Sequence, residues 1–457
     1  MKGYSKWSFK PYKPLIDTRG DIYICRIAPF KNKIIFNFLN DLGEEFSVYY
    51  KQCNQNDYTF YCKTNKTTCE IIGLLEDCDY CFYLEGNGKK SSVRLARTGA
   101  SVGVTVNYLH PDDDYYAFSG KYLCSPSLIR TKEGCLLSSM DGYAKDYPQN
   151  LTLIFKSVDN GKTWEYVTEL YPCFWGQLFN FNGDVYMIAC TTEYGNLIIS
   201  KSIDGGNSFL EPVTLLRGSN GKNGNDGVHK NPQPPVVFNG RIYFSLEWGS
   251  WANTDFCHAA MVASVKVTDD LLNAENWTFS KPKKFQPFVK EIAHLPLNAM
   301  TIEGTLVEND GNLFNVMRFS GDKQALCYKV NYNDNKAPLE FYSLINFPAN
   351  LSKFTIKYNA ETNAYYSIAT INYNNSKPWA RNYLALLKSY DLKEWKIVKD
   401  IYNYTNSSPE KIGFQYVSFE FSGDDIIFIC RTAQNGANSY HNSNYQTFDV
   451  IKNFKIL

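Results

Sequence analysis

A turn followed by an apolar strand recurs six times after residue 99, and this repeat constrains the fold more than any other feature of the sequence. The copies lie about 50 to 70 residues apart, and helical periodicity is almost absent between them. Repetition at this spacing is typical of a β-propeller, in which each repeat forms one blade. The copies begin at Glu133, Asn182, Asn239, Asp310, Thr362 and Gly423.

The six strands end at equivalent positions, which a propeller brings to the mouth of its central channel. Four of the six end residues are ionisable, whereas a strand buried between blades favours apolar or small ones. We therefore expect this ring to form part of a binding site, although an ordinary polar loop entry is the simpler alternative. The ring consists of Asp141, Cys190, Glu247, Arg318, Thr370 and Arg431.

A second ring is expected from the strand that precedes each hairpin. Its members would lie near the same rim of the propeller. They are Ser125, Trp175, Asn231, Glu303, Phe354 and the pair Gln415–Tyr416.

Three short motifs with the form of an Asp box lie between the hairpins. Ser157 to Trp164 (SVDNGKTW) fits S-x-D-x-G-x-T-W in full, Ser202 to Phe209 fits in part, and Ser389 to Trp395 is shortened. The aspartate of such a motif accepts backbone N–H bonds in a tight turn, the glycine supplies a positive φ and the aromatic ring packs between blades. We therefore expect Asp159, Asp204 and Asp391 to be structural.

The chain resembles the sialidase superfamily beyond these motifs. Residues 302–318 (IEGTLVENDGNLFNVMR) resemble the sialidase segment in which a glutamate opens one strand and an arginine closes the next. The resemblance implies that Glu303 activates a nucleophile and that Arg318 binds a substrate carboxylate. It also implies a second such arginine at Arg381, before an Asp box, and a tyrosine nucleophile at Tyr416.

The chemistry of these residue types agrees with that resemblance. Guanidinium groups bind a carboxylate through paired hydrogen bonds, and a neutral tyrosine suits an anionic substrate that would repel a carboxylate nucleophile. A carboxylic acid must protonate the leaving oxygen, and Asp141 is the candidate by position. Cys124 and Ser125 stand where the family opens its first blade with Arg-Ile-Pro. Arg431 could take the place of that missing arginine.

Three histidines are expected at junctions between loops and strands, where they could converge on one mouth. His110, His229 and His441 hold these positions, and Lys230 and Asn231 follow His229 directly. Surface loop residues are the alternative for each histidine. A histidine beside an arginine or a tyrosine also suits a propeller lyase that eliminates next to a uronate. The histidine spacing fits no zinc motif, so no metal or other cofactor is expected.

Residues 1–98 are expected to form a separate small β-sandwich of the immunoglobulin-like class. The segment CEIIGLLEDCDYCFYLEGNGKKSSVRL resembles the later half of a fibronectin type III domain. That family ends one strand with a Gly-Leu step, here Gly73–Leu74, and places a corner tyrosine soon after, here Tyr80.

Five cysteines crowd into the same region: Cys53, Cys62, Cys69, Cys78 and Cys81. A metal knuckle around Cys78 and Cys81, or a disulfide, is one reading of this cluster. We favour reduced strand cysteines, because no second CxxC motif is present.

Composition excludes several classes of protein. The formal net charge is +1 and no run of Lys and Arg is dense enough for a phosphate-binding face, so nucleic acid is not an expected partner. No apolar stretch is long enough to span a membrane. The first 20 residues show no apolar signal segment, so we expect a cytoplasmic protein or one secreted with its leader removed.

The sequence thus predicts an all-β chain: a fibronectin-type sandwich at 1–98 followed by a six-bladed propeller at 99–457. We expect an exo-acting glycoside hydrolase of sialidase type for a carboxylate-bearing terminal sugar. Tyr416, Glu303 and Asp141 would act in catalysis together with His110 and His441. The substrate would be bound by a further set of residues: Arg318, Arg381, Arg431, Glu247, Trp175, His229, Lys230, Asn231 and Gln415. A uronate lyase and a non-catalytic glycan-binding propeller are the alternatives, and the oligomeric state is left open.

Overall fold

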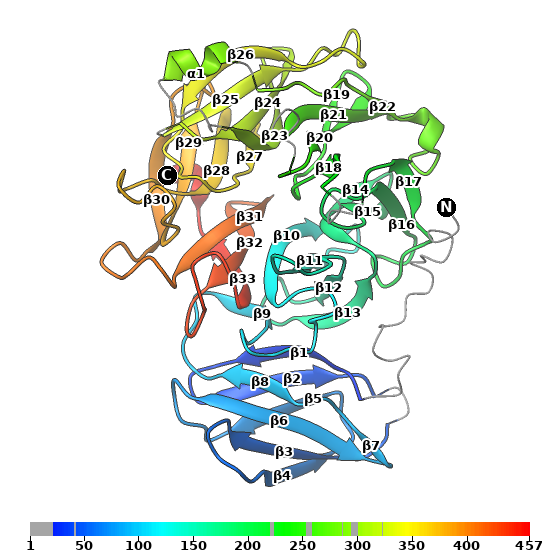
Figure 1. Cartoon of the computed structure of the whole chain (residues 1–457), viewed down its shortest axis with the longest axis vertical. Helices are drawn as coiled ribbons and strands as arrows, with labels where there is room; N and C mark the ends of the chain where they lie inside the picture. Colours follow the sequence, from blue (N-terminus) through cyan, green and yellow to red (C-terminus); the bar gives the residue numbers. More distant parts are fainter. Residues whose placement is uncertain are drawn as a thin grey trace.

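The computed structural model describes residues 22–40, 43–219, 224–252, 258–285, 287–293, 300–321 and 323–457. The N-terminal segment on which the expectation about a leader was based lies outside these residues. The described chain is built almost entirely of antiparallel β-sheets, with one short helix, α1 (Pro287–Ala293), and two 3-10 turns at Ala274–Asn276 and Phe454–Ile456. Figure 1 shows a small two-sheet unit at one end and the remaining sheets arranged above it.

Two sheets form the N-terminal unit. The first has the order β1-β2-β5 and the second the order β4-β3-β6-β7, with β8 also paired to β6. Alternate side chains of these strands point into the space between the sheets, where Phe36, Phe82 and Ile71 are fully buried. The strands are β1 (Ile24–Pro29), β2 (Lys33–Phe38), β3 (Phe46–Gln52), β4 (Thr59–Thr64), β5 (Thr68–Ile72), β6 (Asp79–Gly86), β7 (Lys89–Lys90) and β8 (Arg94–Arg97).

Tyr80 fixes the turn between the two sheets. Its hydroxyl accepts a hydrogen bond of 2.9 Å from the backbone N–H of Leu75. Gly73 takes a φ of 75° just before that turn, a conformation that favours glycine. The Tyr80 hydroxyl thus ties the segment between β5 and β6 to strand β6.

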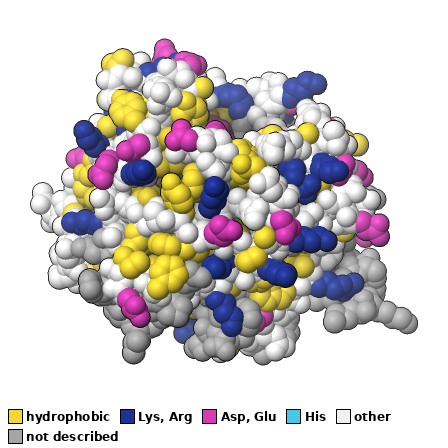
Figure 2. All heavy atoms as spheres, turned by 90° about the horizontal axis from the view of Figure 1, so that it is seen from above, with side chains coloured by type: hydrophobic (Ala, Val, Ile, Leu, Met, Phe, Trp, Pro, Cys, Tyr) yellow, Lys and Arg dark blue, Asp and Glu magenta, His cyan; other side chains and the backbone are white. Residues whose placement is uncertain are grey.

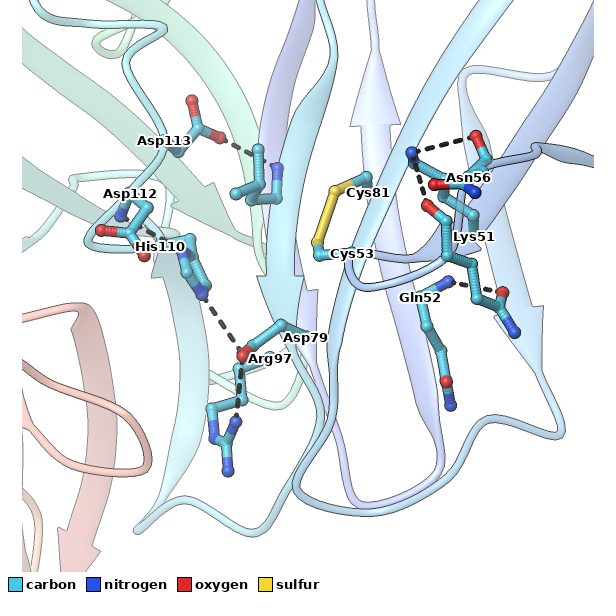
Figure 3. The surroundings of a disulfide bond; sticks show 12 residues. Lys51, Gln52, Cys53, Asn56, Asp79, Cys81, Arg97, His110, Asp112 and Asp113 are labelled. Atoms are coloured by element: carbon cyan, nitrogen blue, oxygen red, sulfur yellow. Dashed lines mark hydrogen bonds and ion pairs between the residues drawn. A yellow bond between two sulfur atoms is a disulfide. The ribbon is translucent and has the colours of Figure 1, made fainter.

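The cysteine cluster contains a disulfide, which corrects the expectation that these cysteines are reduced. A disulfide joins Cys53, directly after β3, to Cys81 in the neighbouring strand β6, and the Cα atoms are 5.4 Å apart (Figure 3). Cys78 keeps a free thiol. A metal knuckle of Cys78 with Cys81 is therefore excluded, because the sulfur of Cys81 is already bonded to Cys53.

Six further sheets follow one another along the described chain. The first five are built from consecutive antiparallel strands, as expected for repeated hairpin units, and the sixth combines three consecutive strands with β9. The first three consist of β10 (Tyr122–Arg130), β11 (Leu136–Tyr143), β12 (Thr152–Ser157) and β13 (Glu165–Leu170); β14 (Phe174–Phe181), β15 (Asp184–Cys190), β16 (Leu197–Ser202) and β17 (Val213–Leu216); and β18 (Gly227–His229), β19 (Val236–Phe238), β20 (Arg241–Gly249), β21 (Ala259–Lys266) and β22 (Thr278–Phe279). The last three consist of β23 (Thr301–Asn309), β24 (Asn312–Phe319), β25 (Gln324–Lys329) and β26 (Glu340–Asn346); β27 (Ile356–Asn359), β28 (Ala364–Thr370), β29 (Tyr383–Ser389) and β30 (Lys396–Asn403); and β31 (Gly413–Ser422), β32 (Asp425–Ala433), β33 (Tyr445–Ile451) and β9 (Val104–Tyr108).

The last sheet joins the two ends of this region. Strand β9, which precedes the first of the six sheets, pairs with β33 of the sixth. Strand β10 of the first sheet also packs against β31 of the sixth. The sixth sheet therefore lies beside the first, and its outermost strand comes from the opposite end of the repeat region (Figure 1).

The Asp boxes hold turns at the periphery. Asp159 accepts hydrogen bonds from the backbone N–H of Thr163 at 2.9 Å and from the hydroxyl of Ser157 at 2.8 Å. Burial raises the pKa of Asp159, but these hydrogen bonds outweigh that effect and lower it to about 2. Trp164 is buried and packs on Phe448 of the sixth sheet. The first box thus helps to hold the first sheet against the last.

A buried polar interface joins the N-terminal unit to the six sheets. Arg94 forms an ion pair with Asp113 at 2.8 Å, and both side chains are at most 2% exposed. Arg26 donates to the carbonyl oxygens of Val106 and Thr105, on β9. Because these charges are buried and fully engaged, separating the two units would expose unpaired groups.

The charged surface is mixed. On the face drawn in Figure 2, Lys and Arg side chains lie between Asp and Glu rather than gathering in one patch. Among the described residues, no helix is both long and apolar enough to cross a bilayer.

Candidate active site

A cavity of about 410 Å³ is the centre of the candidate site. Its lining comes from five of the six sheets that follow the N-terminal unit and from loops, including those before β27 and β29 of the fifth sheet. Eight of the residues predicted from the sequence line it: Trp175, His229, Glu303, Arg318, Arg381, Tyr416, Arg431 and His441.

Backbone irregularities aim several of these side chains. The pairing of the first strand with the second shifts register at equivalent points of the first, second, fourth and sixth sheets. The residues at these bulges have positive φ, with values of 28° for Ser125, 53° for Trp175, 60° for Glu303 and 56° for Tyr416. Such a conformation costs on the order of 1–3 kcal/mol for a residue other than glycine, and bulges commonly redirect a side chain next to an active site.

Tyr416 and Glu303 form the central pair. The Tyr416 hydroxyl donates a short hydrogen bond to Oε1 of Glu303, although the two residues lie on the sixth and fourth sheets. Arg318 Nη1 bonds the other oxygen, Oε2, at 2.6 Å. Burial raises the pKa of Glu303, but Arg318 and Tyr416 outweigh it and hold that pKa below its usual value. Glu303 is thus an ionised acceptor for the phenolic proton.

The net shift in pKa is opposite for Tyr416. Desolvation raises the pKa of its phenol well above the usual value, and the charge of Glu303 raises it further, while the surrounding arginines lower it. The phenol is therefore protonated in the resting site, with Glu303 as the acceptor of its hydrogen bond.

Three guanidinium groups surround this pair. Arg318 has Glu303 as its ion-pair partner. Arg381 bonds the carbonyl oxygen of Leu351 at 3.1 Å and the side-chain oxygen of Gln415, and burial followed by the charge of Arg318 lowers its pKa to about 10. Arg431 lies over the ring of Tyr416, 5.1 Å from its centroid. Within the described chain, neither Arg381 nor Arg431 has a carboxylate partner.

Arg431 contacts the first sheet at Cys124. Its Nη1 donates to the sulfur of Cys124 at 3.1 Å, and Nη2 donates to the carbonyl oxygen of His441. Cys124 and Arg431 both line the cavity. A guanidinium thus stands beside the first sheet, although that sheet supplies none at this position itself.

His441 forms part of the cavity wall. Burial and the charges of Arg431 and Arg381 lower its pKa to about 2, so the ring is neutral at physiological pH. The ring packs edge-on against Tyr143, 5.4 Å away.

Asp141 does not line the cavity, which corrects its assignment as the acid by position. Oδ1 accepts from the hydroxyl of Thr152, and Oδ2 accepts from the backbone N–H of Trp175 at 2.8 Å. Burial raises the pKa of Asp141 to about 7 despite these hydrogen bonds. The side chain is fully buried and supports Trp175 from behind.

His110 also lies away from the cavity. Its Nε2 faces Oδ1 of Asp79 at 3.3 Å, and Nδ1 accepts from the N–H of Asp112 (Figure 3). Since Asp79 belongs to β6, His110 connects the N-terminal unit to the six sheets. Its expected place at the mouth is therefore wrong, because the loop after β9 turns toward the sandwich.

Four further predicted residues do not line the cavity, and three of them bond residues that do. Glu247 bonds His229, and Lys230 bonds the carbonyl oxygen of Trp175 at 3.0 Å. Gln415 holds Arg381. Asn231 is buried, and its side-chain nitrogen and oxygen have no hydrogen-bond partner among the described residues.

The mouth contains groups that the sequence reasoning missed. Glu193 lines the cavity and accepts from Trp251 Nε1 at 3.3 Å. With Tyr143 and Trp251 it also lines an adjoining cavity of about 580 Å³, where Asp146 is found. These residues lie in the segments after the aligned strand ends, so the repeat gave no signal for Glu193 and Asp146. Within the described chain, no group of three or more His, Cys, Asp or Glu side chains could hold a metal ion.

Comparison with known proteins finds structures of similar fold but no match by sequence. No family profile matches the chain, and no curated protein matches its sequence. Several solved glycoside hydrolases are similar in structure. An α-L-arabinanase of Penicillium chrysogenum, complexed with arabinobiose, has 14% sequence identity and a TM-score of 0.50, with 77% of this chain and 97% of that chain covered.

Two sialidase-type enzymes are also similar. The leech intramolecular trans-sialidase has 10% identity and a TM-score of 0.52, with 94% of this chain and 95% of that chain covered. A Trypanosoma rangeli sialidase in complex with sialic acid has 14% identity and a TM-score of 0.51, with 78% and 59% covered. At such identities the likeness shows a shared fold alone. The chain has the propeller fold of these glycosidases, as the sequence predicted.

Proposed function

We propose that this protein is a glycoside hydrolase that removes a terminal sugar bearing a carboxylate. The observation that carries the proposal is the pair of buried arginines, Arg381 and Arg431, without a carboxylate partner in the described chain, in the same cavity as Tyr416 and Glu303. A buried cation without a counter-ion is costly, and a substrate carboxylate would supply that counter-ion.

The reaction would proceed through a glycosyl-tyrosine. The Tyr416 oxygen attacks the anomeric carbon while its proton passes to Glu303, and the bond to the leaving oxygen breaks. That oxygen takes a proton from a carboxylic acid and departs as an alcohol. Water then attacks the anomeric carbon and gives one proton to the carboxylate left by the acid, which restores the acid. The bond between the anomeric carbon and the tyrosine oxygen breaks, and that oxygen takes its proton back from Glu303.

The acid in this scheme is one of the two carboxyl groups at the mouth, Glu193 or Asp146. Both line the adjoining cavity, which is where the rest of the glycan would extend from the cleaved bond. A proton donor must reach the leaving oxygen directly or through one water molecule. Asp141 has no such access.

We also propose that the six sheets are the six blades of a closed propeller, and that residues 1–98 are a fibronectin-type sandwich. Support for the first comes from β10 packing on β31 and from β9 pairing with β33. Support for the second comes from the strand orders β1-β2-β5 and β4-β3-β6-β8 and from the Tyr80 corner.

The test is incubation with a panel of oligosaccharides that end in a sialic acid or a uronic acid, with products followed by mass spectrometry. We expect release of the terminal sugar with the addition of one water. An unsaturated product that absorbs in the ultraviolet would show elimination instead, and no release from any glycan would reject the hydrolase proposal.

A further inference from the structure

The cavity has two unlike sides. The three arginines come from the fourth sheet, from the loop before β29 and from the sixth sheet, whereas Trp175 and His229 come from the second and third. The Trp175 and His229 rings pack together with centroids 4.3 Å apart. This second side offers an aromatic surface and an imidazole rather than a cation.

The peptide groups of Trp175 are held on both sides by buried charged residues. Asp141 Oδ2 accepts its N–H at 2.8 Å, and Lys230 Nζ donates to its carbonyl oxygen at 3.0 Å. Asp141 and Lys230 are at most 1% exposed. Because Trp175 has a positive φ, these two contacts hold it in a conformation that its own backbone disfavours.

His229 is fixed in a similar way by Glu247. Its Nδ1 lies 2.6 Å from Oε2 of Glu247, whose Oε1 accepts the N–H of Gly304 at 3.1 Å. Glu247 is fully buried and His229 is 3% exposed. A carboxylate on Nδ1 fixes the ring orientation and tautomer, so that Nε2 is the polar atom left for a ligand. In the described chain, Nε2 has no hydrogen-bond partner.

We propose that Trp175 and His229 recognise the uncharged, hydroxyl-bearing part of the sugar, opposite the carboxylate. The sugar ring packs against Trp175, and His229 Nε2 forms a hydrogen bond with one hydroxyl. This inference rests on the proposed function, because it assumes that the arginines hold the carboxylate of the same sugar. Asp141, Lys230 and Glu247 are then positioning residues.

A charge on this side restricts the substrate further. Glu247 stands directly behind His229. A second anionic group on the sugar, such as a sulfate, would face this carboxylate and would be repelled. The preferred ligand is therefore a sugar with a single negative charge.

The test measures binding of three probe sugars by calorimetry: N-acetylneuraminic acid, D-glucuronic acid and a sulfated glucuronic acid. Wild type is compared with His229→Ala, His229→Gln, Arg381→Ala and Tyr416→Phe. For a monoanionic probe that wild type binds, we expect His229→Ala to weaken affinity by about 3- to 10-fold, the usual worth of one hydrogen bond. His229→Gln should restore part of the lost affinity, and Tyr416→Phe should leave the affinity close to that of wild type. Of the three probes, the sulfated sugar should bind most weakly.

Kinetics on a cleaved aryl glycoside provide the second measurement. His229→Ala should raise KM with kcat within a few-fold of wild type, because the lost contact is made before and during the reaction alike. Unchanged affinity in His229→Ala, or a loss confined to kcat, would overturn the recognition role while leaving the hydrolase proposal intact. Tighter binding of the sulfated probe would overturn the single-charge preference. Failure of wild type to bind any probe would reject this inference together with the proposed function.

Discussion

The hydroxyl of Tyr416 bonds the carboxylate of Glu303 across 113 residues of sequence, from a bulge in one sheet to a bulge in another. Both residues have a positive φ, a backbone conformation that is energetically unfavourable for residues other than glycine. A buried phenol next to an ionised glutamate and three arginines has no evident structural need. Buried ionisable groups with shifted pKa values are typical of functional sites, and the proposed hydrolase uses this pair as nucleophile and proton acceptor.

Replacing Tyr416 by Phe should abolish turnover. The change removes the attacking oxygen and little else, so we expect kcat to fall by roughly 10³-fold or more while the melting temperature stays close to wild type. Steady-state kinetics and thermal unfolding measure the two effects. Tyr143→Phe is the matched control, because Tyr143 lines the same cavity without a carboxylate partner in the described chain, and its kcat should change only a few-fold. Equal activity in the two variants would exclude Tyr416 as the nucleophile.

Replacing Arg381 by Ala should weaken recognition of the substrate carboxylate. Hydrogen bonds to charged groups contribute about 1.5–3 kcal/mol, so kcat/KM should fall by roughly 10- to 100-fold. A substrate in which the carboxylate is converted to an amide should lose most of its activity with wild type and show little further loss with Arg381→Ala. Arg130→Ala is the control, because Arg130 bonds Gly134 and Asn160 at the far end of its strand. An Arg381 variant as active as that control would contradict the anion clamp.

The acid at the mouth can be identified by its dependence on the leaving group. A nitrophenolate departs without a proton, whereas a sugar alcohol needs one. The variant that removes the acid, Glu193→Gln or Asp146→Asn, should therefore lose about 10²- to 10⁴-fold on an oligosaccharide and far less on an aryl glycoside. The variant at the other carboxyl group and Asp141→Asn should lose similar amounts of activity on the oligosaccharide and on the aryl glycoside. A uniform loss on both substrates in Glu193→Gln and Asp146→Asn would place the acid elsewhere.

Lys353 should make stability depend on pH. The side chain is buried, and its one hydrogen bond within the described part of the chain is a 3.5 Å contact to the carbonyl oxygen of Val417. Burial lowers its pKa to about 7. The unfolded chain keeps this proton to near pH 10.5, so the free energy of unfolding should rise between pH 7 and 10.5. At pH 6, Lys353→Met should increase the free energy of unfolding by on the order of a few kcal/mol. In this variant the free energy of unfolding should no longer increase between pH 7 and 10.5.

Chemical denaturation at several pH values measures this effect. Lys396→Met, a change at an exposed lysine of β30, should leave the slope as in wild type. The idea of a buried, neutral lysine would fail if Lys353→Met kept the wild-type pH dependence.

The repeat pattern was enough to predict the register of the site. Aligning six hairpins placed Trp175, Glu303 and Tyr416 at equivalent positions, and the structure has a bulge at each. It also placed Arg318 and Arg431 at strand ends, and both line the cavity. Period and strand polarity determine these positions, and both can be read from a sequence.

The same pattern did not predict which side chains reach the cavity when this depends on the depth of burial or on the direction of a loop. Asp141 shares the strand-end position of Arg318, but its shorter side chain is enclosed by Thr152 and the peptide of Trp175. His110 follows a strand of the last sheet, yet its loop turns toward Asp79. The disulfide of Cys53 with Cys81 depends on the pairing of β3 with β6, which no local pattern gives.

The pairing of β9 with β33 also sets the order in which a growing chain can become active. Residues 445–451 must be synthesised before the strand at 104–108 finds its partner, and the sheet they share carries Tyr416 and Arg431. Tyr416 itself is synthesised earlier, but the sheet that carries it is complete only once β33 has paired with β9. Under the proposed function, activity would therefore appear only after the last strand of the chain has joined the first strand of the repeat region.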